Sequence, residues 1–285
     1  MVRVLAPATV ANLGPGFDAL GLALDWYDEV TVEPIERGLE ITASGPGADA
    51  VLTDETNGIA RGVRALLGDE TGLRVHRRAE VAFGRGFGSS AISYVAGLVA
   101  ARALSGGDDS DDRLLAEATR LEGHPDNVAP CLLGGITVCA GGRVARLDPP
   151  AGIGVLTCVA PGGLVTAEAR AVLAETVSRV AAVDNVGRAG LLVAALASGR
   201  ADLLFEATAD RLHQDARFEL MPESAALVRG LRAGGFAAFL SGAGPSVSAL
   251  VDDARAAAAR TLASILAEGW TVRVVPIAAR GAHVA

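Results

Sequence analysis

The sequence predicts an α+β protein built from two domains, residues 1–153 and residues 154–285. Its 285 residues are enough for two domains with substantial cores. In the first half, segments with the alternation of antiparallel strands are followed by helical segments, which indicates a sheet backed by helices. In the second half, the order of strands and helices is typical of an α+β sandwich. The Gly- and Pro-rich stretch at 148–154 separates the two halves.

Periodicity and turn residues define the expected elements of the first half. The Gly- and Pro-rich segment at 6–18 predicts an ordered connection. Gly123 follows an amphipathic pattern and predicts a helix end. In chain order we expect a strand at 3–5, antiparallel strands at 19–33 and 39–44, a helix at 57–67, a strand at 73–81, an amphipathic helix beginning near Ser89, a helix at 113–122 and a strand at 131–140.

The second half begins with an apolar strand and ends with one. Thr166 is a good helix cap, and a second glycine-rich loop at 241–245 lies between two apolar runs. In chain order we expect a strand at 155–159, helices at 167–177, 186–198, 202–212 and 222–233, strands on both sides of the 241–245 loop, a helix at 253–268 and a strand at 270–276.

The charge balance argues against two classes of partner. The chain has 33 acidic and 25 basic residues, for a net charge of −8, and every basic residue is an arginine. This balance disfavours general affinity for nucleic acid or for an anionic membrane surface. There is no uninterrupted apolar run of about 18 residues and no signal-peptide pattern, so we expect a cytoplasmic protein without a membrane partner.

A glycine-rich loop at the centre of the first half reads as an anion site. Gly84, Gly86 and Gly88 have no Cβ to block a ligand from the backbone N–H groups. The helix that follows should begin at Ser89 and Ser90, which places its positive dipole end at the loop. Phosphate is the natural occupant, although a plain turn is the alternative. The missing lysine excludes a Walker A loop, and the glycine spacing does not fit a dinucleotide fingerprint.

Polar side chains are concentrated in two further segments. Glu122, His124, Asp126 and Asn127 occupy six residues between an apolar helix and an apolar run. Turn chemistry explains Asp and Asn there but not the adjacent Glu and His. Asn12 and Asp18 flank a Gly-Pro-Gly turn, and both could serve that turn alone. Residues 122–127 are therefore the stronger candidates for a site.

Together these segments resemble the GHMP superfamily of small-molecule kinases, which includes galactokinase, homoserine kinase, mevalonate kinase and phosphomevalonate kinase. The resemblance covers essentially the whole chain and is closest to the homoserine kinases. It implies an N-terminal domain like domain 2 of ribosomal protein S5 and a C-terminal ferredoxin-like α/β sandwich. The motifs that carry it are PATVANLGPGFDALGLAL at 7–24, GRGFGSSA at 84–91, EGHPDNVAPCLLGG at 122–135, TAEAR at 166–170, DRLHQ at 210–214 and LSGAGPSV at 240–247.

The resemblance implies ATP- and Mg²⁺-dependent phosphorylation of the L-homoserine hydroxyl to O-phospho-L-homoserine, on the route to threonine, by a homodimer. It assigns the ATP phosphates to the loop and the start of its helix: Gly84, Arg85, Gly86, Phe87, Gly88, Ser89, Ser90 and Ala91. It assigns the metal to Ser90 and Glu122. It assigns homoserine to Asn12, Asp18, His124, Asn127, Arg170 and Arg217. Asp126 and Asn127 are its catalytic candidates, with a general-base role for Asp126 left open.

Two arginines suit this substrate, because their guanidinium forks pair bidentately with a carboxylate. Without the resemblance, Arg170 and Arg217 would read as ordinary solvated arginines. The chain departs from the family pattern at Val10, at Ala82-Phe83, and at Asp215-Ala216 before Arg217. The last departure could change how Arg217 meets the substrate.

Three alternatives stay open. The first is another GHMP kinase acting on a different carboxylate-bearing alcohol, such as mevalonate or shikimate; the missing lysine counts against mevalonate. The second is a catalytically silent member that only binds ligands. The third is a nucleic-acid-binding protein, because the expected first domain also occurs in ribosomal proteins; the acidic balance disfavours it.

Overall fold

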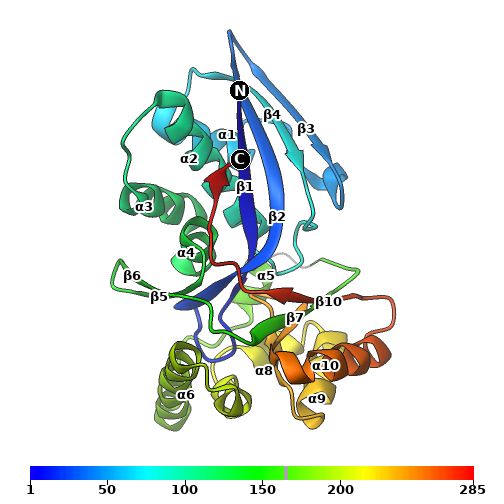
Figure 1. Ribbon diagram of the computed structural model, residues 1–285. Coiled ribbons are helices and arrows are strands. Elements are labelled where there is room, and N and C mark those ends of the chain that lie inside the picture. The colour runs from blue at the N-terminus through cyan, green and yellow to red at the C-terminus, as the bar shows by residue number, and fades with distance from the viewer. Residues whose placement is uncertain (164–165) are drawn as a thin grey trace.

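The computed structural model describes residues 1–163 and 166–285, which form two β-sheets, each covered by helices (Figure 1). The sheet drawn in the upper part of Figure 1 carries helices α1–α4, and helices α6, α9 and α10 lie around the lower sheet. We retain the division at residues 153 and 154 as a proposal.

The first sheet has seven strands in the order β11-β1-β2-β4-β3, with β5 on β2 and β6 on β5. Strand β2 is the central strand of this sheet, because the second half of β2 pairs with β4 and its first residues pair with β5. The strands are β1 (Val2–Ala11), β2 (Leu20–Ile35), β3 (Leu39–Ser44), β4 (Gly72–Arg78), β5 (Ile136–Ala140), β6 (Arg143–Leu147) and β11 (His283–Val284).

Two expectations for this sheet were wrong. The first strand does not end at Leu5: β1 continues to Ala11, so residues 6–11 are strand rather than connection. The register shifts between Pro7 and Thr9, and such an irregularity allows a proline inside a strand. Strand β3 is not antiparallel to its neighbour, because it pairs with β4 in parallel. The connection through α1 makes this crossover possible.

Helices pack on this sheet through a buried pair. α1 (Gly58–Leu67) has Asn57 as its N-cap, and α2 (Ser89–Ser105) has Gly88 as its N-cap and Gly106 as its C-cap. A Cβ on Gly97 would lie 2.3 Å from a backbone oxygen of α1, so glycine permits the two helices to touch. The sequence predicted an amphipathic helix here, but α2 is buried on most sides and is apolar around most of its surface.

Two shorter helices complete the first half. α3 (Asp111–Glu122) ends at Gly123 in the left-handed conformation, as predicted. α4 (Pro125–Leu133) follows directly and overturns the expected strand at 131–140, whose strand part begins only at Ile136. The polar segment at 122–127 therefore spans the end of one helix and the start of the next.

The second sheet has four antiparallel strands in the order β10-β7-β9-β8. Its strands are β7 (Ile153–Val159), β8 (Ala237–Leu240), β9 (Val247–Asp252) and β10 (Thr271–Pro276). Its helices are α5 (Thr166–Ala171), α6 (Arg179–Ser198), α7 (Leu204–Ala207), α8 (Gln214–Phe218), α9 (Pro222–Ala233) and α10 (Asp253–Leu266). The helices expected at 222–233 and 253–268 are confirmed. The helix expected at 167–177 ends at Ala171, and the one expected at 202–212 is a 3-10 turn followed by α7 and ends at Ala207.

Helix α6 is long and apolar enough to cross a membrane by length and composition alone. One side of it packs into the core through Leu192, Ala195 and Leu196. On another side, Arg188 pairs with Asp184 one turn earlier. In this fold α6 is a helix of the second half.

The end of the chain returns to the first sheet. β11 pairs with β1, so the two ends of the chain lie side by side (Figure 1). The backbone of Ala278 donates to Ala23 O and accepts from Gly135 N–H, and the N–H of Ala282 donates to Cys131 O. Residues 277–285 therefore belong to the packing of the first half.

Candidate active site

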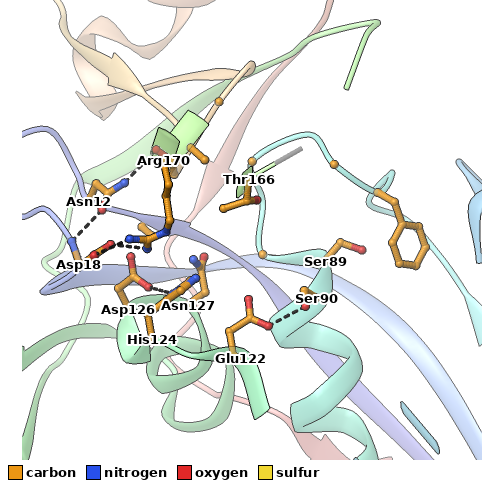
Figure 2. Close-up of a pocket in the computed structure, with 18 of the residues that line it drawn as sticks. Asn12, Asp18, Ser89, Ser90, Glu122, His124, Asp126, Asn127, Thr166 and Arg170 are labelled. Atoms are coloured by element: carbon orange, nitrogen blue, oxygen red, sulfur yellow. Dashed lines mark hydrogen bonds and ion pairs between the residues drawn. The ribbon is translucent and has the colours of Figure 1, made fainter. Parts of the chain in front are cut away.

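A pocket of about 460 Å³ lies where the two halves meet (Figure 2). Both glycine-rich loops, the first turns of α2 and α4, and α5 contribute to its wall. Its lining residues are Ala11, Asn12, Asp18, Phe83, Gly84, Gly86, Gly88, Ser89, Ser90, Tyr94, Glu122, His124, Asp126, Asn127, Thr166, Arg170, Arg217, Gly242, Ala243 and Gly244.

One end of the pocket is built from backbone. Gly84, Gly86 and Gly88 all have positive φ, as their glycine identity predicts. α2 begins at Ser89, so its unpaired N–H groups point to this end. A Cβ on Gly86 would lie 2.3 Å from Ser241 O of the second glycine loop. The two loops thus meet at close range, and their contact closes this end.

Three residues assigned to the phosphates do not line the pocket with their side chains. The Phe87 and Ala91 side chains are fully buried in the core. Arg85 lies beside Gly163, within 2.6 Å of where a Cβ on that glycine would be. Only the backbone of Phe87 and Ala91 could reach a ligand, and these assignments stay predictions.

Ser90 and Glu122 face each other across the pocket (Figure 2). The Ser90 hydroxyl donates to Glu122 Oε2 over 2.6 Å. Burial raises the pKa of the Glu122 carboxyl, while the Ser90 hydrogen bond opposes that rise. In residues 1–163 and 166–285 no group of three His, Cys, Asp or Glu side chains could hold a metal. One carboxylate and one hydroxyl fit Mg²⁺, which takes oxygen ligands and keeps waters and phosphate oxygens for the rest.

The start of α4 presents three polar side chains. His124 Nδ1 and Asp126 Oδ1 share a hydrogen bond of 2.5 Å, and Asp126 is 2% exposed. This bond is the main cause of the raised pKa of His124. The Thr9 hydroxyl donates to Asn127 Oδ1 over 2.7 Å. Asn127 is therefore oriented with its NH₂ group left as a donor.

Asn12 and Asp18 lie on a strained turn. Both residues have positive φ, which is costly for residues with side chains. The Asn12 amide donates to Gly242 O over 2.8 Å and accepts from the Asp18 N–H over 3.0 Å. The side chain of Asn12 thus serves the turn and ties it to the second glycine loop. Asn12 thus does what the alternative interpretation predicted, because its side chain stabilises the turn, and it also lines the pocket.

Asp18 and Arg170 form a bidentate ion pair across the pocket. Arg170 Nη1 and Nη2 donate to the two carboxylate oxygens over 2.9 and 2.7 Å. The residues are 152 positions apart and come from the two halves of the chain. Both side chains are about one-third exposed. Figure 2 shows the pair next to Asn12 and Asp126.

Arg217 is a buried cation without a carboxylate partner among the described residues. It is 1% exposed, and its Nε donates to Ala169 O over 3.1 Å. Its Nη1 lies 3.1 Å from His213 Nδ1. The other ring nitrogen of His213 lies 2.9 Å from Gly14 O, so the ring is neutral, with Nε2–H donating and Nδ1 accepting from Arg217.

Burial lowers the pKa of the Arg217 guanidinium, and the nearby Arg170 charge adds to that effect. The ring of Phe17 stacks on His213, and the Arg217 guanidinium lies over Phe17 at 5.4 Å. The more distant charges of Asp18, Asp210 and Asp126 oppose this lowering of the pKa. A desolvated guanidinium that lines a pocket and has no directly paired carboxylate in the described part of the chain attracts an anionic ligand group.

Sequence reasoning missed several residues of this pocket. Tyr94 lies one helical turn after Ser90 on α2, and that spacing could have identified it. Thr166 was expected only as a helix cap, and the loop at 241–245 was given no role, yet both line the pocket. Thr9 and His213 contact the lining residues Asn127 and Arg217 from behind, and although both lie inside motifs named above, neither was singled out.

Two family models match the chain. The model for the GHMP kinases N terminal domain matches residues 56–135, and that for the GHMP kinases C terminal domain matches residues 192–265. The homoserine kinase of Streptomyces avermitilis is 47% identical over 99% of this chain and 95% of its own length. The homoserine kinase of Leifsonia xyli is 44% identical over 99% of this chain and 91% of its own length.

Solved structures agree with these matches. The crystal structure of homoserine kinase from Cytophaga hutchinsonii superimposes with a TM-score of 0.90 at 31% identity, covering 100% of this chain and 97% of that one. A mevalonate kinase from L. major has the same fold at a TM-score of 0.73 and 18% identity, covering 97% and 96%. The expected two-domain α+β GHMP kinase fold is confirmed. With matches of this identity over nearly its full length, the chain belongs to the homoserine kinase family of the GHMP kinases.

Proposed function

We propose that this protein transfers the γ-phosphoryl group of ATP to the hydroxyl of L-homoserine, giving O-phospho-L-homoserine and ADP on the route to threonine. The observation that carries this proposal is Arg217, a buried guanidinium without a carboxylate partner among the described residues, which lines the same pocket as the glycine loop. One side of the pocket suits phosphates, and the other suits a substrate carboxylate.

The glycine loop and the start of α2 would hold the ATP phosphates through backbone N–H groups, with Ser89 and Ser90 at the helix terminus. Ser90 and Glu122 would hold Mg²⁺ between them, in place of their present hydrogen bond. When bound, the ion neutralises charge on the phosphates. The support for this role is the pair of oxygen donors at the helix start, 2.6 Å apart.

The amino-acid part of homoserine would lie among Asp18, Arg170 and Arg217. A zwitterion can satisfy both members of the Asp18–Arg170 pair: its ammonium pairs with Asp18 and its carboxylate with Arg170 and Arg217. A substrate with only one of these charges leaves one of the paired residues without a partner. This requirement favours an α-amino acid over mevalonate or shikimate.

The start of α4 would position the acceptor hydroxyl. Phosphoryl transfer depends on in-line placement and charge neutralisation more than on covalent chemistry. Asn127, fixed by Thr9, offers its NH₂ group to the substrate. Asp126 holds the ring of His124, whose other nitrogen can reach the ligand. We therefore propose a positioning role for Asp126 through His124, with Asn127 as a direct contact.

A coupled ADP-release assay tests the proposal directly. Mg²⁺-ATP is offered with L-homoserine, L-threonine, L-serine, mevalonate and shikimate. Preference for homoserine by kcat/KM is the expected result. Preference for another carboxylate-bearing alcohol would overturn the substrate assignment and leave the phosphate site. ATP binding without turnover of any acceptor would favour the silent binder instead.

Two statements about the state of the protein are also proposals. The family is one of soluble enzymes, and we propose a cytoplasmic location. We further propose a homodimer, which sedimentation velocity over a range of concentrations would test. Val180, Val183 and Val186 are 80%, 67% and 73% exposed on α6, so that side of the helix has apolar surface to offer.

A further inference from the structure

Beneath the phosphate loop lies an ion pair that does not reach the pocket. Arg77 on β4 and Asp28 on β2 are both fully buried, at 0% exposure. Arg77 Nε donates to Asp28 Oδ2 over 2.8 Å, and Arg77 Nη2 also contacts that oxygen. Neither residue belongs to the pocket lining or to the motifs that identify the family.

The remaining bonds of this pair go to both ends of the glycine loop. On the entry side, Asp28 Oδ1 accepts the N–H groups of Glu80 and Val81 over 2.7 and 3.1 Å. On the exit side, Arg77 Nη2 donates to Ser89 Oγ over 2.9 Å, and Nη1 donates to Ser93 Oγ over 2.9 Å. One buried pair therefore fixes the residues that lead into the loop and the first turn of α2 after it.

The two serines differ in how their own hydroxyl hydrogen is used. Ser93 Oγ accepts from Arg77 and donates to Ser89 O over 3.1 Å, so its donor is engaged. Ser89 Oγ also accepts from Arg77, but its hydrogen finds no acceptor among the described residues, and Ser89 lines the pocket. Because Arg77 occupies a lone pair of Ser89 Oγ, the O–H group is left to donate to a ligand.

A buried ion pair is weak evidence for stability, since apolar residues of similar volume often replace one at no cost. Its value lies in geometry, because a planar guanidinium fixes several acceptors at once. The Phe83 ring, 4.1 Å from the Arg77 guanidinium, shields it and lines the pocket on its other side.

We propose that Arg77 and Asp28 are positioning residues for phosphoryl transfer, which orient the Ser89 hydroxyl as a donor to a nucleotide phosphate and hold the start of α2 against the glycine loop. This inference rests on the proposed function only in that the loop holds nucleotide phosphates. Arg77 itself touches no ligand and acts through Ser89.

Ser89→Ala and Ser93→Ala form the matched pair that tests the proposal. Each removes one acceptor of Arg77 from the same helix, but only Ser89 lines the pocket described above. Ser93 lines the smaller adjoining cavity of about 180 Å³ instead. Loss of one charge-assisted hydrogen bond to a phosphate should raise the KM for ATP by about 10- to 100-fold in Ser89→Ala. Ser93→Ala should keep the KM for ATP within about twofold of the unmodified protein, even where its Tm falls. Equal effects of the two changes on the KM for ATP would overturn the proposal.

A double replacement tests whether Arg77 acts through Ser89. Arg77→Met with Asp28→Asn removes both charges and keeps an oxygen for the N–H groups of Glu80 and Val81. We expect a raised KM for ATP, an unchanged KM for homoserine, and little further effect of Ser89→Ala in that background. A full Ser89→Ala effect there would refute the coupling.

Direct titration with Mg²⁺-ADP keeps this result separate from the substrate assignment. Nucleotide affinity should follow the same pattern in all variants even where homoserine is not the acceptor. If the double variant does not fold, the serine comparison still decides. Nucleotide binding that is unchanged in Ser89→Ala would overturn the inference even in an active homoserine kinase.

Discussion

Replacing Arg217 by methionine removes the one cation of the pocket that has no carboxylate partner among the described residues. Methionine keeps an unbranched apolar stem of similar length against Phe17. No carboxylate of the described residues pairs directly with the buried guanidinium, although the charges of Asp18, Asp210 and Asp126 partly offset its burial, so its removal relieves a desolvation cost. The change also leaves Ala169 O, Gly242 O and His213 Nδ1 without their Arg217 donor, which costs stability. We therefore expect little net change in resistance to unfolding, while the affinity for homoserine falls.

The size of the loss follows from the burial of Arg217. A guanidinium and a carboxylate about 4 Å apart at an effective dielectric constant of about 20 attract each other by about 4 kcal/mol. The substrate carboxylate must leave water, which reduces the net gain toward about 2 kcal/mol. At about 1.4 kcal/mol per factor of ten, the KM for homoserine should rise between about 30-fold and about 1,000-fold. The KM for ATP should stay nearly constant.

The assay is ADP release at saturating Mg²⁺-ATP with homoserine varied, together with urea denaturation of both proteins. Arg232→Met is the control, because Arg232 is an arginine of the same half whose pKa burial lowers, and it donates to Phe205 O and Ala238 O away from the pocket. The control should keep its KM for homoserine. An unchanged KM in Arg217→Met, or lost stability in place of lost affinity, would refute the assignment.

Three further changes test other parts of the site. Glu122→Gln should raise the Mg²⁺ concentration at half-maximal rate at least about tenfold with little change in homoserine affinity, and equal metal dependence would exclude Glu122 as a ligand. Asp18→Asn releases Arg170 from its ion pair, so calorimetry should show weaker binding of homoserine but tighter binding of 4-hydroxybutyrate, which has no ammonium group. Weaker binding of both ligands would contradict the proposal that the substrate's charges replace the Asp18–Arg170 pair. Burial lowers the pKa of His213 in the folded protein, so the unfolded chain takes up the proton first, near its ordinary value of about 6.5. Stability should therefore be fully present above that pH and fall below it, by up to about 1.4 kcal/mol per pH unit, whereas His213→Gln should lack this slope in denaturation measured from pH 5 to 8.

Most elements could be predicted because their signals are local. The helix expected at 57–67 is found at Gly58–Leu67, and the helix end at Gly123 and the helix start at Ser89 are where the sequence placed them, because their signals act within a few residues. The misses have physical causes. Residues 6–11 contain Pro7 and three alanines, which have little strand preference, and only the long pairing with β2 makes them a strand.

Helix α4 was missed for a related reason. Pro125 and Pro130 frame it and read as turn residues, but Pro125 occupies the first helical position, where its missing N–H costs nothing. Pro130 leaves Asp126 O without its helical partner. That oxygen faces Gly21 of β2, where a Cβ would lie 1.9 Å away. Tertiary packing determines that residues 125–133 are helical, and no local sequence pattern predicts this.

The pocket residues were found by motif, but their pairings could not be. Asp18 was expected to bind a ligand, which stays a prediction, but its pair with Arg170, 152 residues away, was not expected. Asp28 and Arg77 carried no signal, because nothing in an apparently ordinary strand pattern reports that two of its charges are buried together. Contacts of this kind depend on strand order, which the sequence alone leaves open.

The return of residues 277–285 to the first sheet affects the order in which this protein can fold during its synthesis. The first half leaves the exit tunnel first, yet the backbone groups of Ala23, Gly135 and Cys131 bond to residues that are translated only after the second half. Those backbone groups remain bonded to water, and one edge of β1 remains unpaired, throughout synthesis of the second half. Folding of the first half during synthesis therefore stops one strand short until β11 is made, when His283 pairs with Leu5, 278 positions earlier in the chain (283 − 5).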